Sequence, residues 1–325
     1  MDEDYSKDNR RNARNQAKAD HFKNGKSQVR RHKDKVIESN ERNPTYEAEV
    51  SHLGSKNRSA LAKETVKLLD ELDEDHTEYR DEYIKNTKLF LEDNEIELSE
   101  DLKPIHDDGP DLEFPIQSII SFINDIDEND LDKWVILNYA NPTKPGGNFE
   151  KDASVYEETL SISSGLYYSL SKGKGKSMYE KNKKLEEKDE TDDGVYRGDL
   201  IYSPDVPFFR DEDFDLIEDW KNEYRNVSII SIPAVIYCKF STTDEFSKYD
   251  YETIMRERIN RIYQVALKHG HTKIVLGPWG CGLEKGPLKD VSKWFFEDDL
   301  ADFFDEIYFL CDDEETSKIM KSAVF

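Results

Sequence analysis

The sequence predicts a mixed α/β fold in which helices cover both faces of a central sheet. Short, β-branched apolar runs typical of buried strands alternate with longer segments whose apolar residues recur at helical spacing. Two of these runs end in glycine-rich loops, and ligands bind such α/β folds at the carboxyl ends of the strands. We expect strands at 134–140, 199–209, 227–237, 272–276 and 306–311.

An N-terminal helical extension should precede the sheet. From about residue 58, five residues recur at the spacing of one helix face: Leu61, Thr65, Leu68, Leu69 and Leu72. Residues 114–123 are expected to form a short helix or a buried segment, whereas 73–112 are acidic and mixed. Residues 1–55 lack periodic apolar residues and are expected to be a disordered basic and polar tail, which leaves 56–325 as the folded domain.

Further helices are expected between and after the strands. One should run from 154 to 170, and another should cover 250–270, where Gly270 is suited to end it. A helix near 287–300 and a C-terminal helix complete the set. The segment 171–194 is low in complexity and highly charged, so we expect a surface insertion or loop there.

The charge of the chain is strongly acidic and unevenly placed. Charged residues make up 36% of the sequence, and the formal net charge is −25. Residues 1–35 nevertheless carry 11 basic against 6 acidic residues, so the remainder is more acidic still. An acidic body repels a phosphodiester backbone, which argues against a general nucleic-acid binder. Backbone amides can still supply the local field of a single anion site.

Cysteine usage and hydropathy favour a cytoplasmic or nuclear protein. The three cysteines form no CxxC pair, as expected in a reducing compartment without a disulfide framework or a zinc knuckle. The first residues contain no apolar segment of a secretory signal, and the longest apolar stretch, 227–237, is too short to span a bilayer. We therefore expect no membrane association. The expected oligomeric state is a monomer.

The segment VILNYANPTKPGGNFEKDASVYEETL, residues 135–160, carries the densest pattern. It leads from an apolar run into a loop with Gly146 and Gly147, and a later strand leads into Gly277 and Gly280-Cys281-Gly282. Backbone N–H groups of two such loops could hold a diphosphate without a lysine, although such glycines also serve ordinary turns. The motifs GxxxxGK[ST] and GxGxxG are absent, which argues against a P-loop and against a nicotinamide cofactor.

Spacing allows two interpretations of the adjacent glutamates Glu157 and Glu158. Ser154 and Glu157 match the S-x-x-E capping box, in which Glu157 reaches back to the helix start while Glu158 favours the helix dipole. Alternatively, a carboxylate in the first helical turn could face a bound sugar and act as general acid and base. Adjacent helical residues point about 100° apart, so the two carboxylates would have different tasks.

Taken together, these motifs resemble a known family. NYANPTKPGGNFEKDASVYEE is similar to the signature of the microbial-type poly(ADP-ribose) glycohydrolases, an N-[FY]-A-N-x-x-x-P-G-G-G loop followed by Q-E-E. Further family segments match, in order, ETVKLL (64–69), MYEKN, IYSPDVPFFRDE (201–212) and RINRIYQVALKHGHTKIVLGPWGCG (258–282). The resemblance covers roughly residues 58–300, with the N-terminal tail and the 171–194 insertion outside it.

This resemblance implies a three-layer α/β/α, macrodomain-like mixed sheet and the hydrolysis of ADP-ribose from protein or polymer. By position, Glu158 would be the catalytic acid and base, Glu157 would hold ribose hydroxyls, and Asn141 would contact the distal ribose. The implied ligand-contacting positions are Asn141, Gly146, Gly147, Asn148, Tyr156, Gly280, Cys281 and Gly282. The implied partner is ADP-ribose or an ADP-ribosylated protein or polymer. No metal and no cofactor is implied.

The chain departs from the family pattern beside the expected ligand. Asn148 replaces the third glycine, Tyr156 replaces the glutamine before the glutamates, and Leu283-Glu284 replaces a Val-Phe pair. A carboxylate at position 284 would repel a diphosphate unless it turned outward. Three hypotheses follow: an ADP-ribosyl glycohydrolase, an ADP-ribose-binding module that has lost catalysis, and a macrodomain-shaped scaffold without a ligand.

Several other residues have both a structural and a functional interpretation. Trp279 is expected to be a core anchor rather than an adenine platform, and Cys281 a small buried residue rather than a nucleophile. His269 and His271 are expected at the surface of a helix-to-strand turn. Three residues could either line the site or belong to an ordinary strand-end turn: Tyr202, Asp205 and Arg210.

Overall fold

The computed structural model describes residues 55–324, with gaps at 76, 107–108, 152–154, 189, 192–193, 221–222 and 241–250. These residues all belong to one of the two units into which the chain divides, Pro44–Phe325. The predicted tail, apart from its last position, lies outside the described residues. The predicted domain boundary at residue 55 therefore stays a prediction.

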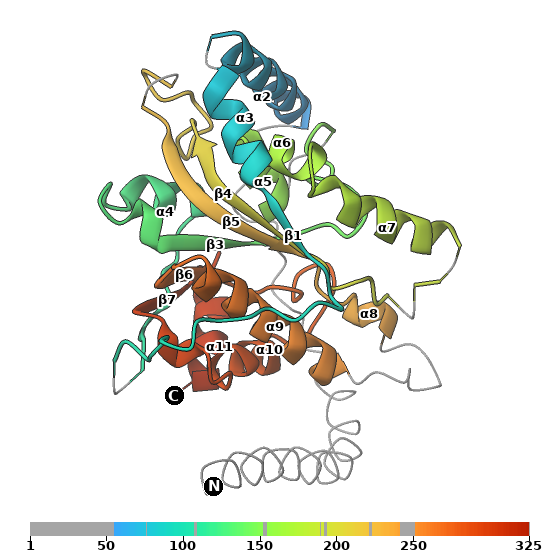
Figure 1. Ribbon diagram of the computed structural model, residues 1–325, viewed down its shortest axis with the longest axis vertical. Coiled ribbons are helices and arrows are strands. Elements are labelled where there is room, and N and C mark those ends of the chain that lie inside the picture. The colour runs from blue at the N-terminus through green and yellow to red at the C-terminus, as the bar shows by residue number, and fades with distance from the viewer. Residues whose placement is uncertain are drawn as a thin grey trace, which may run out of the picture. The chain divides into compact units, whose positions relative to one another are not determined.

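A seven-stranded mixed sheet forms the centre of this unit (Figure 1). The strand order is β1-β4-β5-β3-β6-β7-β2. The last five strands in this order run parallel, whereas β4 is antiparallel to both β5 and β1. The C-terminal ends of β5, β3 and β6 therefore lie next to one another at one end of the sheet. The strands are β1 (Lys88–Phe90), β2 (Asp111–Glu113), β3 (Trp134–Tyr139), β4 (Leu200–Phe208), β5 (Arg225–Ile232), β6 (Lys273–Leu276) and β7 (Glu306–Phe309).

Helices cover both faces of the sheet, as the sequence predicts (Figure 1). One face is covered by α9 (Tyr251–Lys268), α10 (Leu288–Phe296) and α11 (Glu314–Val324). The other is covered by α4 (Ile119–Asp125), α5 (Tyr156–Ser163), α6 (Leu166–Ser171) and α7 (Lys176–Glu187). The N-terminal extension is α2 (Ser55–Asp75) and α3 (Thr77–Asn86), and the short elements are α8 (Tyr237–Phe240), η2 (Leu131–Lys133) and η3 (Ala301–Phe303). No helix in the described part of the chain is long and apolar enough to cross a bilayer.

Alternation along the strands divides the core into two main clusters. On β3, Val135 and Leu137 enter the cluster under α9 and α10, while Trp134 and Ile136 enter the cluster under α4 and α5. Successive side chains of a strand point to opposite faces, so a continuous apolar run such as WVIL serves both. This confirms the prediction that 134–140 is a strand buried on both sides.

The predicted helix 154–170 is two helices, α5 and α6, separated at Ser164 and Gly165. Ser164 forms a bridge with Phe208, and the Gly165 N–H donates to the Pro207 carbonyl at 2.9 Å. A Cβ on Gly165 would lie 2.6 Å from the Tyr83 hydroxyl oxygen. The break is therefore a tertiary effect, since the chain must approach β4 and α3 closely there.

The segment 171–194 is not simply a surface loop, because α7 occupies its centre. Met178, Tyr179 and Asn182 are buried on this helix, and the lysines and glutamates around them face outward. The prediction of a loop was wrong because a short apolar stripe is hidden in a strongly charged composition. Three inward residues are enough to dock one face of a helix on the sheet.

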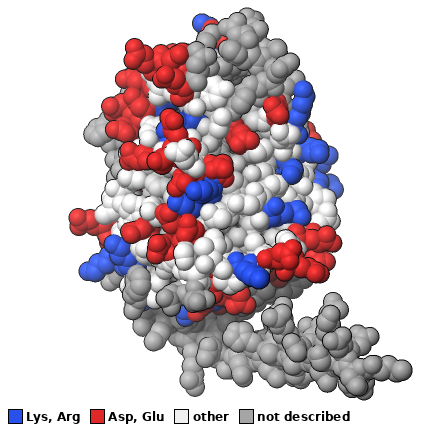
Figure 2. Space-filling view, turned by 60° about the vertical axis from the view of Figure 1, so that its left-hand side comes forward, with Lys and Arg blue, Asp and Glu red and all other residues white. Residues whose placement is uncertain are grey.

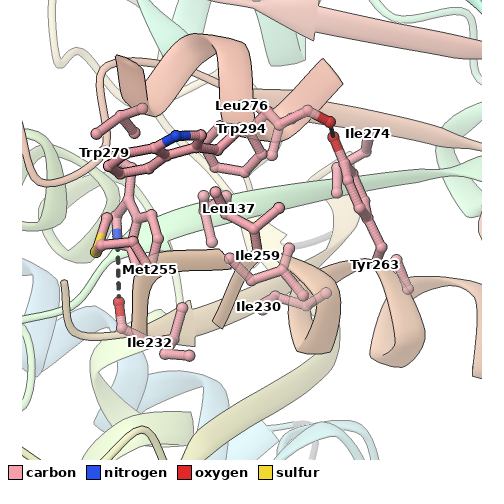
Figure 3. Close-up of a cluster of buried hydrophobic side chains, with 14 of the residues drawn as sticks. Leu137, Ile230, Ile232, Met255, Ile259, Tyr263, Ile274, Leu276, Trp279 and Trp294 are labelled. Carbon is pink, nitrogen blue, oxygen red and sulfur yellow. Dashed lines mark hydrogen bonds between the residues drawn. The ribbon is translucent and has the colours of Figure 1, made fainter. Parts of the chain in front are cut away.

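The larger core cluster lies between the sheet and the helices α9 and α10 (Figure 3). Trp279 is fully buried in it, and its indole Nε1 donates to the carbonyl of Ile232 at 3.2 Å. Tyr263 of α9 donates its hydroxyl to the Phe295 carbonyl of α10 at 3.0 Å. Trp279 is thus the core anchor that the sequence predicts, and it fixes the loop after β6 to the end of β5.

The prediction that His269 and His271 lie at the surface was wrong. His271 is 3% exposed, and its Nε2 lies 2.9 Å from the hydroxyl oxygen of Tyr202. His269 is half-buried and stacks on the Tyr202 ring with a centroid distance of 3.8 Å. Burial lowers the pKa of each histidine to about 4. Adjacent β4 and β1 supply this packing, which the helix-to-strand turn alone does not reveal.

We predict that these histidines make the fold acid-sensitive. Their folded-state pKa lies below the ordinary value of 6.5, so the unfolded chain binds protons that the folded chain excludes. Their contribution to stability is fully present above pH 6.5 and is lost as the pH falls toward 4. The free energy of unfolding in urea at pH 7 and pH 5 measures this. His271→Gln should reduce the difference between the two pH values, and an unchanged difference would contradict the assignment.

Candidate active site

The loop that follows β3 is closed by its own backbone and by one side chain. Asn141 Oδ1 accepts hydrogen bonds from the N–H groups of Thr143 (3.0 Å) and Lys144 (2.9 Å). The Gly147 N–H donates to the Lys144 carbonyl at 3.0 Å, and Phe149 is buried at the far end of the loop. The NYAN and PGG motifs therefore form one compact turn at the carboxyl end of the central strand.

Glu157, in the first turn of α5, is held by this loop and by β3. Its Oε2 accepts from the backbone N–H of Asn141 at 2.7 Å, and its Oε1 accepts from Asn138 Nδ2 at 3.3 Å. Asn138, on β3, is itself held by β5, because its Nδ2 also donates to Ser231 Oγ at 3.0 Å. Glu157 is 3% exposed, so its carboxyl is placed by the loop and by β3, which β5 supports through Asn138, rather than by solvent.

Glu158 is held by the next part of the same loop. Its Oε1 accepts from the backbone N–H of Asn148 at 2.8 Å, and the residue is 5% exposed. The Asn148 side chain turns the other way, is exposed, and accepts a hydrogen bond from Lys144 Nζ at 3.2 Å. Asn148 therefore presents its backbone to the glutamate and its side chain to solvent.

Gly147 lies where the two carboxyls converge. Its φ is +62°, and a Cβ there would lie 2.3 Å from Glu158 Oε1 and 3.3 Å from Glu157 Oε2. Both the left-handed backbone and the close approach require glycine. Although adjacent helical residues diverge, the two carboxyls share this one neighbour, so they can act on one bound group.

The capping-box interpretation does not account for these bonds. The N-cap of α5 is Val155, which makes no side-chain cap bond, and Ser154 lies outside the described residues. The Glu157 carboxyl turns toward Asn138 and Asn141 instead of toward the helix start. The spacing suggested a cap because S-x-x-E places a glutamate in the first helical turn, whether that glutamate caps the helix or faces a ligand.

Burial raises the pKa of Glu157 well above its ordinary value. The neighbouring Glu158 carboxyl adds to the rise, and hydrogen bonds from Asn141, Asn138 and the Gly146 backbone oppose it without cancelling it. Two interacting carboxyls titrate as a pair. Glu157 therefore keeps its proton to a higher pH than an isolated glutamate does.

The second glycine-rich loop, 277–286, leaves β6 beside the first. The Gly286 N–H donates to the Gly280 carbonyl at 2.8 Å and closes the loop. Gly280 has φ +74°, and a Cβ on it would lie 2.8 Å from the Ala234 Cβ, in the segment after β5. Cys281 is buried, and burial raises the pKa of its thiol well above the ordinary value, which disfavours a nucleophilic role.

Tyr156 fills space between the two loops. Its ring stacks on Tyr139 with centroids 4.2 Å apart and an interplanar angle of 12°. Burial raises the pKa of the Tyr156 hydroxyl far above its ordinary value. Tyr139 in turn approaches Gly277 so closely that a Cβ there would lie 2.0 Å from the tyrosine oxygen. The glutamine of the family pattern is thus replaced by half of an aromatic pair.

Three candidates lie away from these loops. The Tyr202 hydroxyl contacts Ser228 at 3.2 Å and His271 at 2.9 Å, and Val206 pairs with Val227, so this part of β4 contacts the starts of β5 and β6, away from Glu157. Arg210 is buried, and its Nε donates to the Ile162 carbonyl. Ile162 lies at the opposite end of α5 from the two glutamates. Tyr202, Asp205 and Arg210 therefore belong to structural contacts. Among the described residues, no group of His, Cys, Asp and Glu side chains could hold a metal ion.

The comparisons with known proteins give the family. A model of the microbial-type PARG catalytic domain, in which PARG is poly(ADP-ribose) glycohydrolase, matches residues 18–211. This is more than half of the 325 residues. The chain belongs to this family. It is therefore a glycosidase-type hydrolase of the poly(ADP-ribose) glycohydrolase class.

Solved structures of this family share the fold. The chain is similar to the PARG of Thermomonospora curvata, with 26% identity and a TM-score of 0.68 over 82% of this chain and 98% of that one. The same enzyme bound to the inhibitor ADP-HPD gives 25% identity and a TM-score of 0.65 over the same shares. The PARG of Deinococcus radiodurans in complex with ADP-ribose gives 26% identity and 0.62, over 75% and 96%. No curated protein matches the chain.

The family match corrects one expectation from the sequence. It begins at residue 18, so part of the segment expected to lie outside the resemblance belongs to it. It also runs through 171–194, where α7 contributes buried residues.

Sequence reasoning assigned no role to Asn138, Ser231 or Asn182, all of which contact the site. Asn138 and Ser231 support Glu157, and Asn182 of α7 donates to the carbonyl of Pro142 in the first loop at 3.1 Å. Asn138 and Asn182 stand in the quoted NYAN and MYEKN motifs, which was the available signal. Ser231 offered none, because it interrupts an apolar strand without any local pattern.

We predict that Gly147→Ala is far more damaging than Gly270→Ala. Both glycines have positive φ, +62° and +81°, but a Cβ on Gly270 has nothing within 4 Å, whereas a Cβ on Gly147 clashes with Glu158. Gly270→Ala should cost about 1 kcal/mol of unfolding free energy, from backbone strain alone. Gly147→Ala should cost about 1–3 kcal/mol more and displace the glutamates. Urea unfolding of both variants checks this, and equal losses would refute the close approach.

Proposed function

We propose that this protein hydrolyses the O-glycosidic bond of poly- or mono-ADP-ribosylated substrates, with Glu158 as the acid and base. The observation that carries the proposal is the convergence of two buried carboxyls on Gly147. Each carboxyl accepts a hydrogen bond from a backbone N–H of the loop after β3, residues 140–149, which we call the ligand loop. One family member is solved with ADP-ribose and another with the inhibitor ADP-HPD. ADP-ribose is the ligand that we propose for this chain.

Glu158 supplies and recovers one proton in this mechanism. Its carboxyl gives the proton to the glycosidic oxygen as the bond to the anomeric carbon breaks, which leaves an oxocarbenium-like sugar. The resulting carboxylate takes a proton from water as the water oxygen bonds to that carbon. Atoms balance with water as the only co-reactant. The raised pKa of Glu157 keeps that carboxyl protonated to a higher pH, which reduces the negative charge beside Glu158.

Glu157 has a positioning task beside it. Its two oxygens are bonded to Asn141 and Asn138, so the group cannot rotate freely and offers a fixed acceptor to ribose hydroxyls. A hydroxyl held in one orientation keeps the anomeric carbon at a constant place relative to Glu158. We assign the contact with the distal ribose to Asn141, whose side-chain Oδ1 also accepts from the N–H groups of Thr143 and Lys144 within the loop.

We assign binding of the diphosphate to backbone N–H groups of the two glycine-rich loops. On the face shown in Figure 2, acidic side chains gather on one side and along the lower edge, Lys and Arg are scattered, and the described residues there form no broad basic patch. Glu284 lies in the second loop and is half-buried. Burial raises the pKa of its carboxyl, which weakens its repulsion of a phosphate. We extend the proposal to a cytoplasmic or nuclear location and a monomeric state, from composition.

We predict that Glu158→Gln abolishes hydrolysis and retains ADP-ribose binding. The amide is isosteric but cannot donate and recover a proton, so kcat should fall by about 10²–10⁴-fold. Calorimetry with ADP-ribose should give a Kd within about threefold of the natural chain. Hydrolysis is measured on poly- and mono-ADP-ribosylated protein.

The control and the contrary outcomes separate the hypotheses. His106→Gln, an exposed change remote from both loops, should leave hydrolysis unchanged. Binding without turnover in the natural chain would favour the inactive ADP-ribose-binding module. Absence of binding would refute both the enzyme and the module.

A further inference from the structure

We propose that α7 is a positioning element of the active site, in which Asn182 holds the ligand loop by the Pro142 carbonyl and thereby fixes Glu157. Its consequence for hydrolysis rests on the function proposed above. The placement of the Glu157 carboxyl by Asn182 does not depend on that function. The proposal concerns a helix in the segment that composition alone assigned to a surface loop.

Asn182 is fixed at both ends of its amide. It is fully buried, its Nδ2 donates to the Pro142 carbonyl at 3.1 Å, and its Oδ1 accepts from the Arg197 N–H at 3.1 Å. Donor and acceptor are both used, so the side chain has one orientation. It links the loop after β3 to the segment that leads into β4, two positions away in the sheet.

Pro142 is the residue that follows Asn141, whose N–H makes the shorter bond to Glu157. That bond is 2.7 Å, against 3.3 Å from Asn138. Planar peptides and the fixed φ of proline couple the Pro142 carbonyl to its predecessor. A displaced Pro142 would therefore displace the Asn141 N–H and lengthen its 2.7 Å bond to the Glu157 carboxyl.

Tyr179 gives an independent sign that this face of α7 borders Glu157. It lies three residues before Asn182, on the same side of the helix, and is 2% exposed. The described part of the chain offers its hydroxyl no hydrogen-bond partner. Burial raises the pKa of Tyr179 well above its ordinary value, and the charge of Glu157 adds to the rise.

The position of α7 is set on its other side by an ion-pair network. Lys181 Nζ lies 3.3 Å from Asp199 Oδ2, and Arg197 Nη2 lies 3.1 Å from Asp199 Oδ1. The same Oδ1 accepts from the Glu92 N–H, next to β1, at 2.9 Å. Because these contacts tie α7 to the β1 and β4 side of the sheet, Asn182 can serve as a fixed reference for the loop.

The test measures the titration of the Glu157 carboxyl directly. Protein labelled with glutamate carrying ¹³C at the carboxyl is titrated by NMR, and the Glu157 signal is identified by its loss in Glu157→Gln. In Asn182→Leu, which fills a similar space without a hydrogen-bonding group, the midpoint should rise by about one pH unit. The reason is that the Asn141 hydrogen bond, which lowers the pKa of Glu157, is weakened. In turnover, kcat should fall about 10–100-fold, with KM changed less.

A matched control and a second variant keep the outcome decisive. Tyr196→Phe removes the 2.9 Å bond from Tyr196 to Glu186, another link between α7 and the segment before β4, and should leave the midpoint and kcat unchanged. If Asn182→Leu does not fold, Asn182→Ser, whose hydroxyl is too short to reach Pro142, takes its place. An unchanged midpoint, or an equal rise in Tyr196→Phe, would overturn the proposal. A natural chain without turnover would instead count against the proposed function and leave the titration result standing.

Discussion

Two hydrogen bonds organise the active site: the backbone N–H groups of Asn141 and Asn148 each hold one carboxyl at the start of α5. The distances are 2.7 Å to Glu157 and 2.8 Å to Glu158. The loop and the helix therefore define each other. The loop cannot open, and the helix cannot rotate, without breaking one of these hydrogen bonds to each buried carboxyl. Gly147 permits this arrangement because a side chain would occupy the place of the Glu158 carboxyl.

The arrangement is a compromise between stability and chemistry. A hydrogen bond to a charged group contributes roughly 1.5–3 kcal/mol, yet two adjacent buried carboxyls lose solvation and repel each other. The balance leaves the pKa of Glu157 raised. A site optimised for stability alone would hold a single carboxylate or an amide there. The retained pair instead leaves Glu157 able to keep its proton to a higher pH than an isolated glutamate.

The remaining fold keeps the strand ends in register. Three neighbouring strand ends supply Asn138, the segment around Ala234, and the loop that begins at Gly277. Trp279 fastens the last of these to β5 from inside the core, and α7 fastens the first through Asn182. The two anchors lie on opposite faces of the sheet. Each of the two core clusters therefore holds one part of the site.

The sequence by itself determined the central buried strands and the candidate reactive groups. Buried strands, the long helix ending at Gly270 and the glutamates after a glycine loop follow from residue type and spacing, because each depends on neighbours in the chain. The class of chemistry followed from motifs at several places. The break between α5 and α6, the burial of α7 and the interior position of His271 could not be predicted, since each depends on a distant strand or helix.

Only the tertiary structure decided how the departures from the family pattern are accommodated. Asn148 turns its side chain to Lys144 and its N–H to Glu158, and Tyr156 stacks on Tyr139. The direction of a side chain depends on which segments fold against it, and those segments lie far apart in the chain. The sequence therefore named the groups that can do the chemistry, and packing between distant segments decided that they point at one place.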